Sequence, residues 1–327
     1  MLKTVGNKKR IIELDSLRGI AALLVIVYHY TFRFGVKFDT SVVTNQFSFP
    51  YGHYGVELFF LISGFVIFMS VKENTSPLLF LKKRSIRLFP TFWISMIFTV
   101  VSVYLLDAVE FQVSISDFLV NLTMVPSFFN VKAVDGVYWI LKIEWFFYLV
   151  IFILLLFKII SKTKLLSLGL VSIIVVLSLL IKVHSYSYYA CLFIAGMSFY
   201  SVWKKEDNYL NHVLILSLVL VSVLSYDLEL VIVTAILVII MYLMVYNLLS
   251  FLVIKPLLFL GKISYALYLI HQNFGYAVQL KLIEMEYSNV FLLVLLPLML
   301  SIFFAWAITE YIELPLSKRL QKYLIRV

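Results

Sequence analysis

The chain has 327 residues, of which 63% are apolar and 14% charged, and its mean hydropathy is +1.01. A soluble domain is about half apolar and a quarter charged, so this composition excludes a soluble globular protein and predicts lipid around most of the chain. The net charge is +9, and the single cysteine, Cys191, excludes a disulfide framework and a zinc site built on several cysteines.

Apolar runs long enough to cross a bilayer as helices, which takes about 20 residues, recur along the whole chain. We expect ten spans, at residues 12–32, 54–71, 88–106, 138–157, 164–182, 186–203, 211–225, 228–248, 256–280 and 289–312. The predicted fold class is all-α, a polytopic membrane helix bundle formed by a single domain over residues 1–327. The first run carries Arg18 and lacks a small-residue cleavage site, which argues against a cleaved signal peptide.

The placement of the 27 Lys and Arg residues predicts the orientation. With ten spans, most of these residues fall at the termini and in the loops of one side, as in the segment 72–87. Loops rich in Lys and Arg stay in the cytoplasm, so both termini are predicted to be cytoplasmic. The same placement explains the basic net charge without nucleic acid, for which the chain has no basic, aromatic-interleaved segment. In the outward loop 107–137, apolar residues at helical spacing between Ser114 and Asn130 predict an interfacial helix.

Ionisable side chains inside membrane spans are costly and are therefore functional candidates. Near the predicted cytoplasmic ends lie Asp15, Arg18, Arg84, Arg87, Lys262, Glu310 and Glu313. In the predicted outward halves lie His29, Glu57, Lys142, Glu144 and His271. This sorting predicts a basic inner mouth and a cluster of His and Glu deeper in the bundle.

Arg18 and His29 are eleven positions apart, close to three helical turns, so both are expected on one face of the first span. Their separation along the axis would be roughly 16 Å, similar to that between the phosphate and thioester ends of an extended phosphopantetheine arm. Arginine can bind a phosphate through two hydrogen bonds, and histidine can act as a general base near neutral pH. A purely structural interpretation is also open, in which Arg18 pairs with Asp15 and His29 hydrogen-bonds within the bundle.

Six segments along the chain contain polar or glycine residues among apolar ones. They are 13–29 (ELDSLRGIAALLVIVYH), 55–65 (GVELFFLISGF), 81–90 (LKKRSIRLFP), 139–148 (WILKIEWFFY), 261–271 (GKISYALYLIH) and 313–315 (ELP). In this order the segments resemble the acyltransferase 3 family of integral membrane O-acyltransferases, over residues of about 11 to 318. That family moves acyl groups, commonly acetyl, from cytoplasmic acyl-CoA to hydroxyls of envelope or exported carbohydrates.

The resemblance implies roles for individual residues. The signature arginine and histidine of the family correspond to Arg18 and His29, its Arg-x-x-Arg pair to Arg84 and Arg87, and its aromatic-x-x-Ser element ends at Ser63. Three features depart from the pattern of many relatives. Lys142 replaces a small polar residue before Glu144, Asn273 stands in place of a proline after His271, and no esterase-like domain follows before Val327, so transfer is expected to finish within the membrane domain.

Together these observations give a set of expected site residues. We expect catalytic roles for His29, Glu144 and His271, acyl-CoA binding by Arg18, Arg84 and Arg87, and supporting roles for Asp15, Ser63 and Glu57, with no metal. Structural alternatives stay open. Arg84 and Arg87, just before the span start marked by Pro90, can be topology signals, Ser63-Gly64 can be a helix-packing pair, and His271 can be a buried hydrogen-bonded residue.

The predicted function is that of a multi-pass O-acyltransferase, most simply an O-acetyltransferase, of the bacterial inner membrane. It would use acyl-CoA as co-substrate, without a bound cofactor, and a polysaccharide, oligosaccharide or lipid-linked glycan as acceptor, in contact with membrane lipid. Direct transfer and an acyl-enzyme intermediate are both open. The alternatives are a transporter or flippase in which Glu57, Glu144 and His271 relay ions, or a structural partner in a polysaccharide-export assembly.

Overall fold

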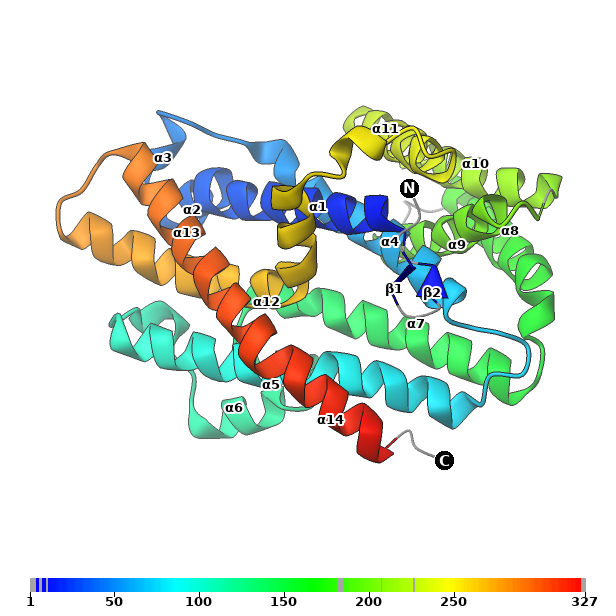
Figure 1. Ribbon diagram of the computed structural model, residues 1–327. Helices are drawn as coiled ribbons and strands as arrows, with labels where there is room; N and C mark the ends of the chain where they lie inside the picture. Colours follow the sequence, from blue (N-terminus) through cyan, green and yellow to red (C-terminus); the bar gives the residue numbers. More distant parts are fainter. Residues whose placement is uncertain are drawn as a thin grey trace. The chain divides into compact units, whose positions relative to one another are not determined.

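The computed structural model describes residues 4–5, 8–9, 11–180, 185–206, 208–225 and 227–324 (Figure 1). Two short antiparallel strands, β1 (Thr4–Val5) and β2 (Lys8–Lys9), pair with each other, and every other regular element of the described residues is helical. The predicted helical fold class is confirmed for this part of the chain.

Fourteen α-helices follow one another in the described residues, with two π-helical turns inside longer helical segments. The α-helices are α1 (Ile12–Tyr28), α2 (Phe34–Phe38), α3 (Ser41–Thr44), α4 (Gly55–Met69), α5 (Pro77–Leu105), α6 (Ile115–Asn121), α7 (Trp139–Leu156), α8 (Thr163–Leu180), α9 (Ser185–Trp203), α10 (Tyr209–Val223), α11 (Leu228–Val245), α12 (Lys255–Glu284), α13 (Val290–Ile308) and α14 (Leu314–Leu324). The π-helical turns are η1 (His29–Arg33) and η8 (Thr309–Glu313). Short 3-10 turns include η2 (Pro50–Tyr54) and η5 (Gly136–Tyr138).

Seven helical segments of the described residues are long and apolar enough to cross a membrane, as expected of an integral membrane protein. They are Ile12–Phe38, Pro50–Met69, Pro77–Leu105, Gly136–Leu156, Ile160–Leu179, Leu228–Val245 and Val290–Leu324. The other three expected runs are helical too, as α9, α10 and α12, but α10 has only 15 residues and α12 carries many polar side chains. The count of ten spans and the orientation of the termini stay predictions, and residues 181–182 of the fifth expected span lie outside the described residues.

One predicted boundary is wrong. Helix α5 begins at Pro77, not near residue 88, so Pro90 lies inside the helix and does not mark its start. Between Ser114 and Asn130, where the sequence predicts a helix, the structure has α6; it begins after Ser114, whose hydroxyl accepts a hydrogen bond from the Asp117 amide at 3.1 Å. Arg84 and Arg87 are therefore residues of a continuous helix and not of an irregular loop.

The chain forms two compact units, each assembled from three separate stretches. The first unit contains Met1–Ala21, Tyr54–Phe80 and Leu149–Leu258, and in Figure 1 its helices α8 to α11 lie together. Helices α4 and α9 touch backbone to backbone, because a Cβ on Gly64 would lie 2.3 Å from the Phe193 carbonyl oxygen and one on Gly196 would lie 2.2 Å from that of Leu61. Small residues allow such close crossings in membranes, which favours the packing interpretation of Ser63-Gly64.

The second unit contains Ala22–His53, Leu81–Tyr148 and Phe259–Val327. Helix α12 supplies much of its interior, since most residues from Gly261 to Gln279 are buried, His271 and Gln279 among them. Polar groups buried in a membrane protein need internal partners, so the polar residues of α12 indicate where a site lies. The prediction of a single domain stays a prediction.

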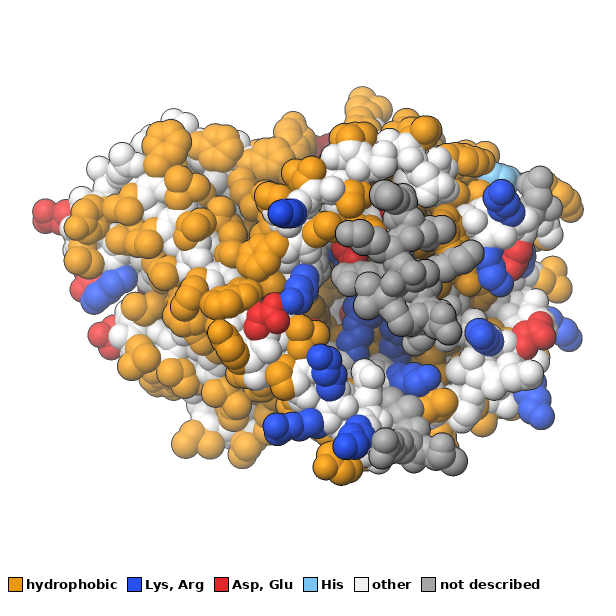
Figure 2. Space-filling view, viewed as in Figure 1, with side chains coloured by type: hydrophobic (Ala, Val, Ile, Leu, Met, Phe, Trp, Pro, Cys, Tyr) orange, Lys and Arg blue, Asp and Glu red, His pale blue; other side chains and the backbone are white. Residues whose placement is uncertain are grey.

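The face of the molecule in Figure 2 is largely apolar, as expected of a protein surrounded by lipid. Figure 2 shows hydrophobic side chains over much of the face, and exposed apolar residues include Trp93, Leu105 and Phe146. Lys and Arg gather over α14, whose residues include Lys318, Arg319 and Lys322 (Figure 2). Basic side chains at the end of a spanning segment are typical of a membrane–water boundary.

Candidate active site

His29 is the first residue of the π-helical turn η1, inside the helical segment Ile12–Phe38. A π-helical turn widens the helix and often occurs at functional sites. The turn is tied to the following loop by Thr31, whose hydroxyl donates to the Val27 carbonyl at 2.6 Å and accepts from the Phe49 amide at 3.2 Å. The backbone around His29 is therefore distorted and yet held in place.

His29 contacts His271 of α12. The Nδ1 atom of His29 lies 3.1 Å from Nε2 of His271, and the two ring planes are inclined at 62°. The fold thus brings together two of the histidines that the sequence singles out, although 242 positions separate them in the chain.

Hydrogen-bond acceptors assign the tautomers of this pair. Nδ1 of His271 lies 2.7 Å from the Tyr268 carbonyl oxygen, so it must carry a hydrogen and leaves Nε2 as an acceptor in the neutral ring. Nδ1 of His29 lies 2.9 Å from the Val25 carbonyl oxygen, so its hydrogen is shared between that oxygen and Nε2 of His271. The lone pair of His29 is then on Nε2, which has no hydrogen-bond partner among the described residues. His29 can act as a base through that atom.

Tyr30 fixes the position of α12 beside His29. Its buried hydroxyl donates to the His271 carbonyl oxygen at 2.7 Å, and since its one hydrogen is used there, it accepts from the Ser301 hydroxyl at 2.8 Å. Gly275 makes room for the ring, because a Cβ at that position would lie 2.2 Å from the Tyr30 hydroxyl oxygen. A second bond runs from the Gln279 amide nitrogen to the Tyr30 carbonyl oxygen at 2.8 Å.

Asp135 connects α12 to the segment before α7. Its side chain is fully buried and accepts hydrogen bonds from the backbone amides of Val137 at 3.1 Å and Asn273 at 2.9 Å. The Asn273 side chain donates in return to the Val134 carbonyl oxygen at 2.7 Å. Burial raises the pKa of the Asp135 carboxyl to about 7, against the lowering effect of these hydrogen bonds and of Lys37. Asn273 therefore has a structural role here.

Glu144 belongs to a separate cluster and does not contact the histidines through any hydrogen bond that the structure shows. Its carboxylate accepts a hydrogen bond from the Tyr148 hydroxyl one turn later in α7. The guanidinium carbon of Arg84 lies 5.5 Å from the centre of the Tyr148 ring, in a cation–π arrangement. The sequence grouped Glu144 with the histidines and Arg84 with the inner mouth; the structure places Glu144 and Arg84 together.

Arg84 and Arg87 differ in exposure. Arg84 is only 6% exposed and lies within electrostatic reach of Glu144, whereas Arg87 is exposed. Arg87 lies within electrostatic reach of Glu313 at the end of the π-helical turn η8. A buried guanidinium needs internal partners to offset its desolvation, whereas an exposed one is accessible to a phosphate.

The remaining expected site residues, Arg18, Asp15, Glu57 and Ser63, lie in the first unit. Arg18 Nη1 lies 3.8 Å from the Asp15 carboxylate, which is the pairing that the structural alternative predicts. Glu57, in the first turn of α4, is buried, and its Oε2 has no hydrogen-bond partner among the described residues. Ser63 is partly exposed next to the α4–α9 crossing at Gly64. The roles of these residues in acyl transfer stay predictions.

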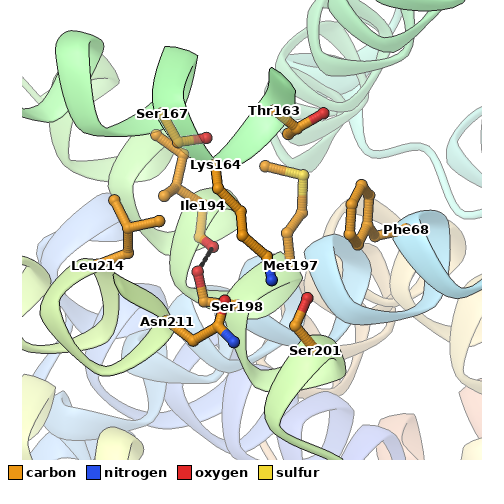
Figure 3. A pocket seen from close by; sticks show the side chains of 10 residues that line it. All are labelled: Phe68, Thr163, Lys164, Ser167, Ile194, Met197, Ser198, Ser201, Asn211 and Leu214. Atoms are coloured by element: carbon orange, nitrogen blue, oxygen red, sulfur yellow. Dashed lines mark hydrogen bonds between the residues drawn. The ribbon is translucent and has the colours of Figure 1, made fainter. Parts of the chain in front are cut away.

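A small cavity lies among α4, α8, α9 and α10 of the first unit (Figure 3). It is lined by Phe68, Thr163, Lys164, Ser167, Ile194, Met197, Ser198, Ser201, Asn211 and Leu214. Figure 3 shows the Ser198 hydroxyl bonded to the Ile194 carbonyl oxygen, at 3.0 Å. Its free space of about 10 Å³ has room for a single water molecule, so this cavity is too small for an acyl thioester.

Sequence reasoning missed Tyr30 and Asp135. Tyr30 is one of 21 tyrosines, and nothing in its neighbourhood in the chain predicts a contact with a residue 241 positions away. Asp135 had a local signal, because an aspartate directly before a helical turn often caps it, and here its carboxylate accepts from the Val137 amide. Among the described residues no three metal-binding side chains lie together.

One known protein family matches nearly the whole sequence. The family model described as an acyltransferase domain, that of the acyltransferase 3 family, matches residues 11–310, nearly the whole chain. No curated protein and no solved structure matches. The match includes both the π-helical turn that begins at His29 and the α12 segment that carries His271. The chain therefore belongs to the acyltransferase 3 family and is an integral membrane acyltransferase.

Proposed function

We propose that the protein is an O-acyltransferase of the bacterial inner membrane that moves an acyl group, in the simplest case acetyl, from cytoplasmic acyl-CoA to a hydroxyl of an envelope or exported carbohydrate. One observation carries the proposal. The hydrogen bonds of His29 and His271 assign the hydrogen of His29 to Nδ1 and its lone pair to Nε2, in a helix distorted at that residue. A fixed, neutral imidazole is suited to general-base catalysis.

The proposed reaction needs one base and one leaving group. Nε2 of His29 takes the proton of the acceptor hydroxyl while the hydroxyl oxygen forms a bond to the thioester carbonyl carbon. The carbon–sulfur bond then breaks, and the thiolate of CoA leaves with the proton that His29 returns. His271 accepts the Nδ1 hydrogen bond of His29 and so keeps the base in the required tautomer and orientation, as the third member of a catalytic triad does.

The acyl donor is proposed to bind through its phosphates. Arg87 supports this role, because its guanidinium is exposed on α5. Arg84 is proposed to hold α5 against α7 through Tyr148 and Glu144 and to contribute positive potential from below the surface. A phosphate role for Arg18 rests on the sequence resemblance and on its position in the helical segment that also carries His29.

The acceptor is proposed to be a carbohydrate. Two exposed aromatic residues support this proposal. Phe47 and Tyr51, in the loop between α3 and α4, are 49% and 55% exposed. Flat aromatic side chains that are left exposed in a polar loop offer the apolar face on which a sugar ring can stack.

The experiment that tests this function follows both halves of the reaction in purified protein. Acetyl-CoA and solubilised envelope glycan are supplied, free CoA thiol is measured, and acetyl ester on the glycan is detected by mass spectrometry. We expect thiol and ester to form in equal amounts and only with both substrates present. Glycan that crosses a vesicle membrane without any release of thiol would contradict the proposal and favour the flippase.

A further inference from the structure

Tyr276 of α12 has a buried polar group without a protein partner. The residue is fully buried, and its hydroxyl has no hydrogen-bond partner among the described residues. A polar group left in this condition is destabilising, and most buried polar groups in native proteins have a hydrogen-bond partner. A fully buried hydroxyl that forms no bond within the protein is therefore a candidate for a bond to a substrate.

The ring of Tyr276 packs beside the ring of the proposed base, His29. The centre of its ring lies 6.3 Å from the centre of the His29 ring, with the planes inclined at 60°. The ring also packs against Phe34 and Phe111, at centroid distances of 5.7 and 6.1 Å. An apolar wall lowers the local dielectric constant and strengthens any hydrogen bond that the phenol forms there.

Positive charge lies close to Tyr276 within the second unit. Lys37 Nζ is 5.2 Å from the centre of the Tyr276 ring and 4.2 Å from that of Phe111, and Arg33 lies within electrostatic reach of Tyr276. Asp135 is the opposing negative group within reach. A hydroxyl donor with two cations within reach of its residue favours the development of negative charge on an atom bound to it.

We propose that Tyr276 is a catalytic residue that donates a hydrogen bond to the carbonyl oxygen of the acyl thioester, an inference that rests on the proposed function. When the acceptor oxygen bonds to the carbonyl carbon and His29 takes its proton, the electron pair of the carbonyl bond moves onto this oxygen. The Tyr276 hydroxyl stabilises the resulting oxyanion without giving up its own proton. When the carbon–sulfur bond breaks, the carbonyl re-forms, the thiolate takes the proton from His29, and the hydrogen bond of Tyr276 weakens again.

The test compares Tyr276→Phe with Tyr138→Phe in the full-length purified protein. Tyr138 is a matched control, because its hydroxyl is also buried in the second unit without a hydrogen-bond partner among the described residues, and its ring packs on Phe92 rather than on His29. The probes are acetyl-CoA and solubilised envelope glycan. The measured quantities are kcat, KM for acetyl-CoA, and the temperature of unfolding in the same detergent.

For Tyr276→Phe we expect kcat to fall about 100-fold, as on removal of one oxyanion donor, with KM for acetyl-CoA unchanged. Unfolding temperature should stay the same or rise in both variants, since each loses a hydroxyl that forms no bond in the folded protein. Tyr138→Phe should keep the wild-type kcat. A wild-type kcat in Tyr276→Phe, a fall in its unfolding temperature, or an equal loss of kcat in Tyr138→Phe would each overturn the role of Tyr276 alone. A wild-type protein that releases no thiol would overturn the proposed function and this role together.

Discussion

His29 shows how a membrane interior can hold a neutral base. Two carbonyl oxygens, of Val25 and Tyr268, fix one hydrogen on each of two imidazoles, and the contact between the rings leaves one lone pair for chemistry. Both rings cannot be protonated at this contact, because two N–H groups would then face each other. The arrangement depends on backbone acceptors and needs no carboxylate beside His29.

Residue type made some of these groups predictable. Histidines and charged residues are rare in lipid-facing sequence, so His29, His271 and Arg84 stand out by their residue type alone. Tyr30 and Tyr276 do not, because tyrosine is common in membrane proteins, and their roles arise only from contacts across the fold. The catalytic role of Glu144 beside the histidines stays a prediction, since depth along the membrane normal does not give the direction of a side chain around its helix.

Asp135 gives a prediction for the dependence of stability on pH. Burial raises the pKa of its carboxyl to about 7 in the folded protein, and in the unfolded chain it would ionise near pH 4. Between these values only the unfolded state loses the proton, so the stability that this group contributes is fully present below about pH 4 and is lost as the pH rises to about 7. Lys37 and the Asn273 and Val137 amides oppose the shift without removing it.

Thermal unfolding of detergent-solubilised wild type and Asp135→Asn, measured from about pH 4 to pH 8, tests this linkage. We expect the unfolding temperature of the variant to change less across the interval than that of wild type, because the titrating group is gone. Equal slopes in the two proteins would show that Asp135 does not titrate there.

At the scale of elements, α12 does most to build the site. It carries His271, Gly275 and Tyr276, and although it has 30 residues, it is not among the helices that are apolar enough for a span. Several polar residues of α12, such as His271, Asn273 and Gln279, are buried within the second unit, so these residues both lower its hydropathy and form the site. Its existence as a helix was predictable from the sequence, and its hydrogen-bond partners were not.

Gly275→Ala tests the close approach of Tyr30 to α12. The added methyl would lie 2.2 Å from the Tyr30 ring, so the ring or the helix must move, at a cost of about 1–3 kcal/mol or more in stability. The matched control is Gly169→Ala in α8, where no atom lies within 4 Å of the added methyl. We expect a lower unfolding temperature for Gly275→Ala and an equal or higher one for the control. Equal behaviour of the two variants would contradict the packing described for Tyr30.

Helix α5 gives a prediction for the binding of the acyl donor. Arg87→Ala should raise KM for acetyl-CoA about 10-fold or more with kcat little changed, because a charge-assisted hydrogen bond contributes about 1.5–3 kcal/mol. Lys83→Ala removes an equal charge from an exposed position of the same helix and should leave KM near its wild-type value. The two KM values are compared under the same salt conditions, since surface charge effects are screened by salt. An unchanged KM in Arg87→Ala would remove Arg87 from the donor site.

At the scale of the whole molecule, the predictions that the structure confirms follow mostly from amino-acid composition. The apolar content predicted a helical membrane protein, and each expected run is helical in the described residues. Arg18 and His29 lie on one helical segment as expected, but they belong to different compact units. Their spacing was predictable from the helical repeat; the division of the chain into units depends on long-range contacts that no local pattern records.

The role of His29 as the base for acyl transfer is tested most directly by the rate of thiol release from acetyl-CoA by His29→Ala, with acceptor present and both substrates saturating. We expect a fall of about 10²- to 10⁴-fold in a protein that unfolds at the wild-type temperature. His212→Ala is the control, since His212 lies in the first unit and contacts the Tyr242 hydroxyl at 2.8 Å, and it should keep the wild-type rate. A His29→Ala protein that transfers acyl groups as fast as wild type would contradict the account.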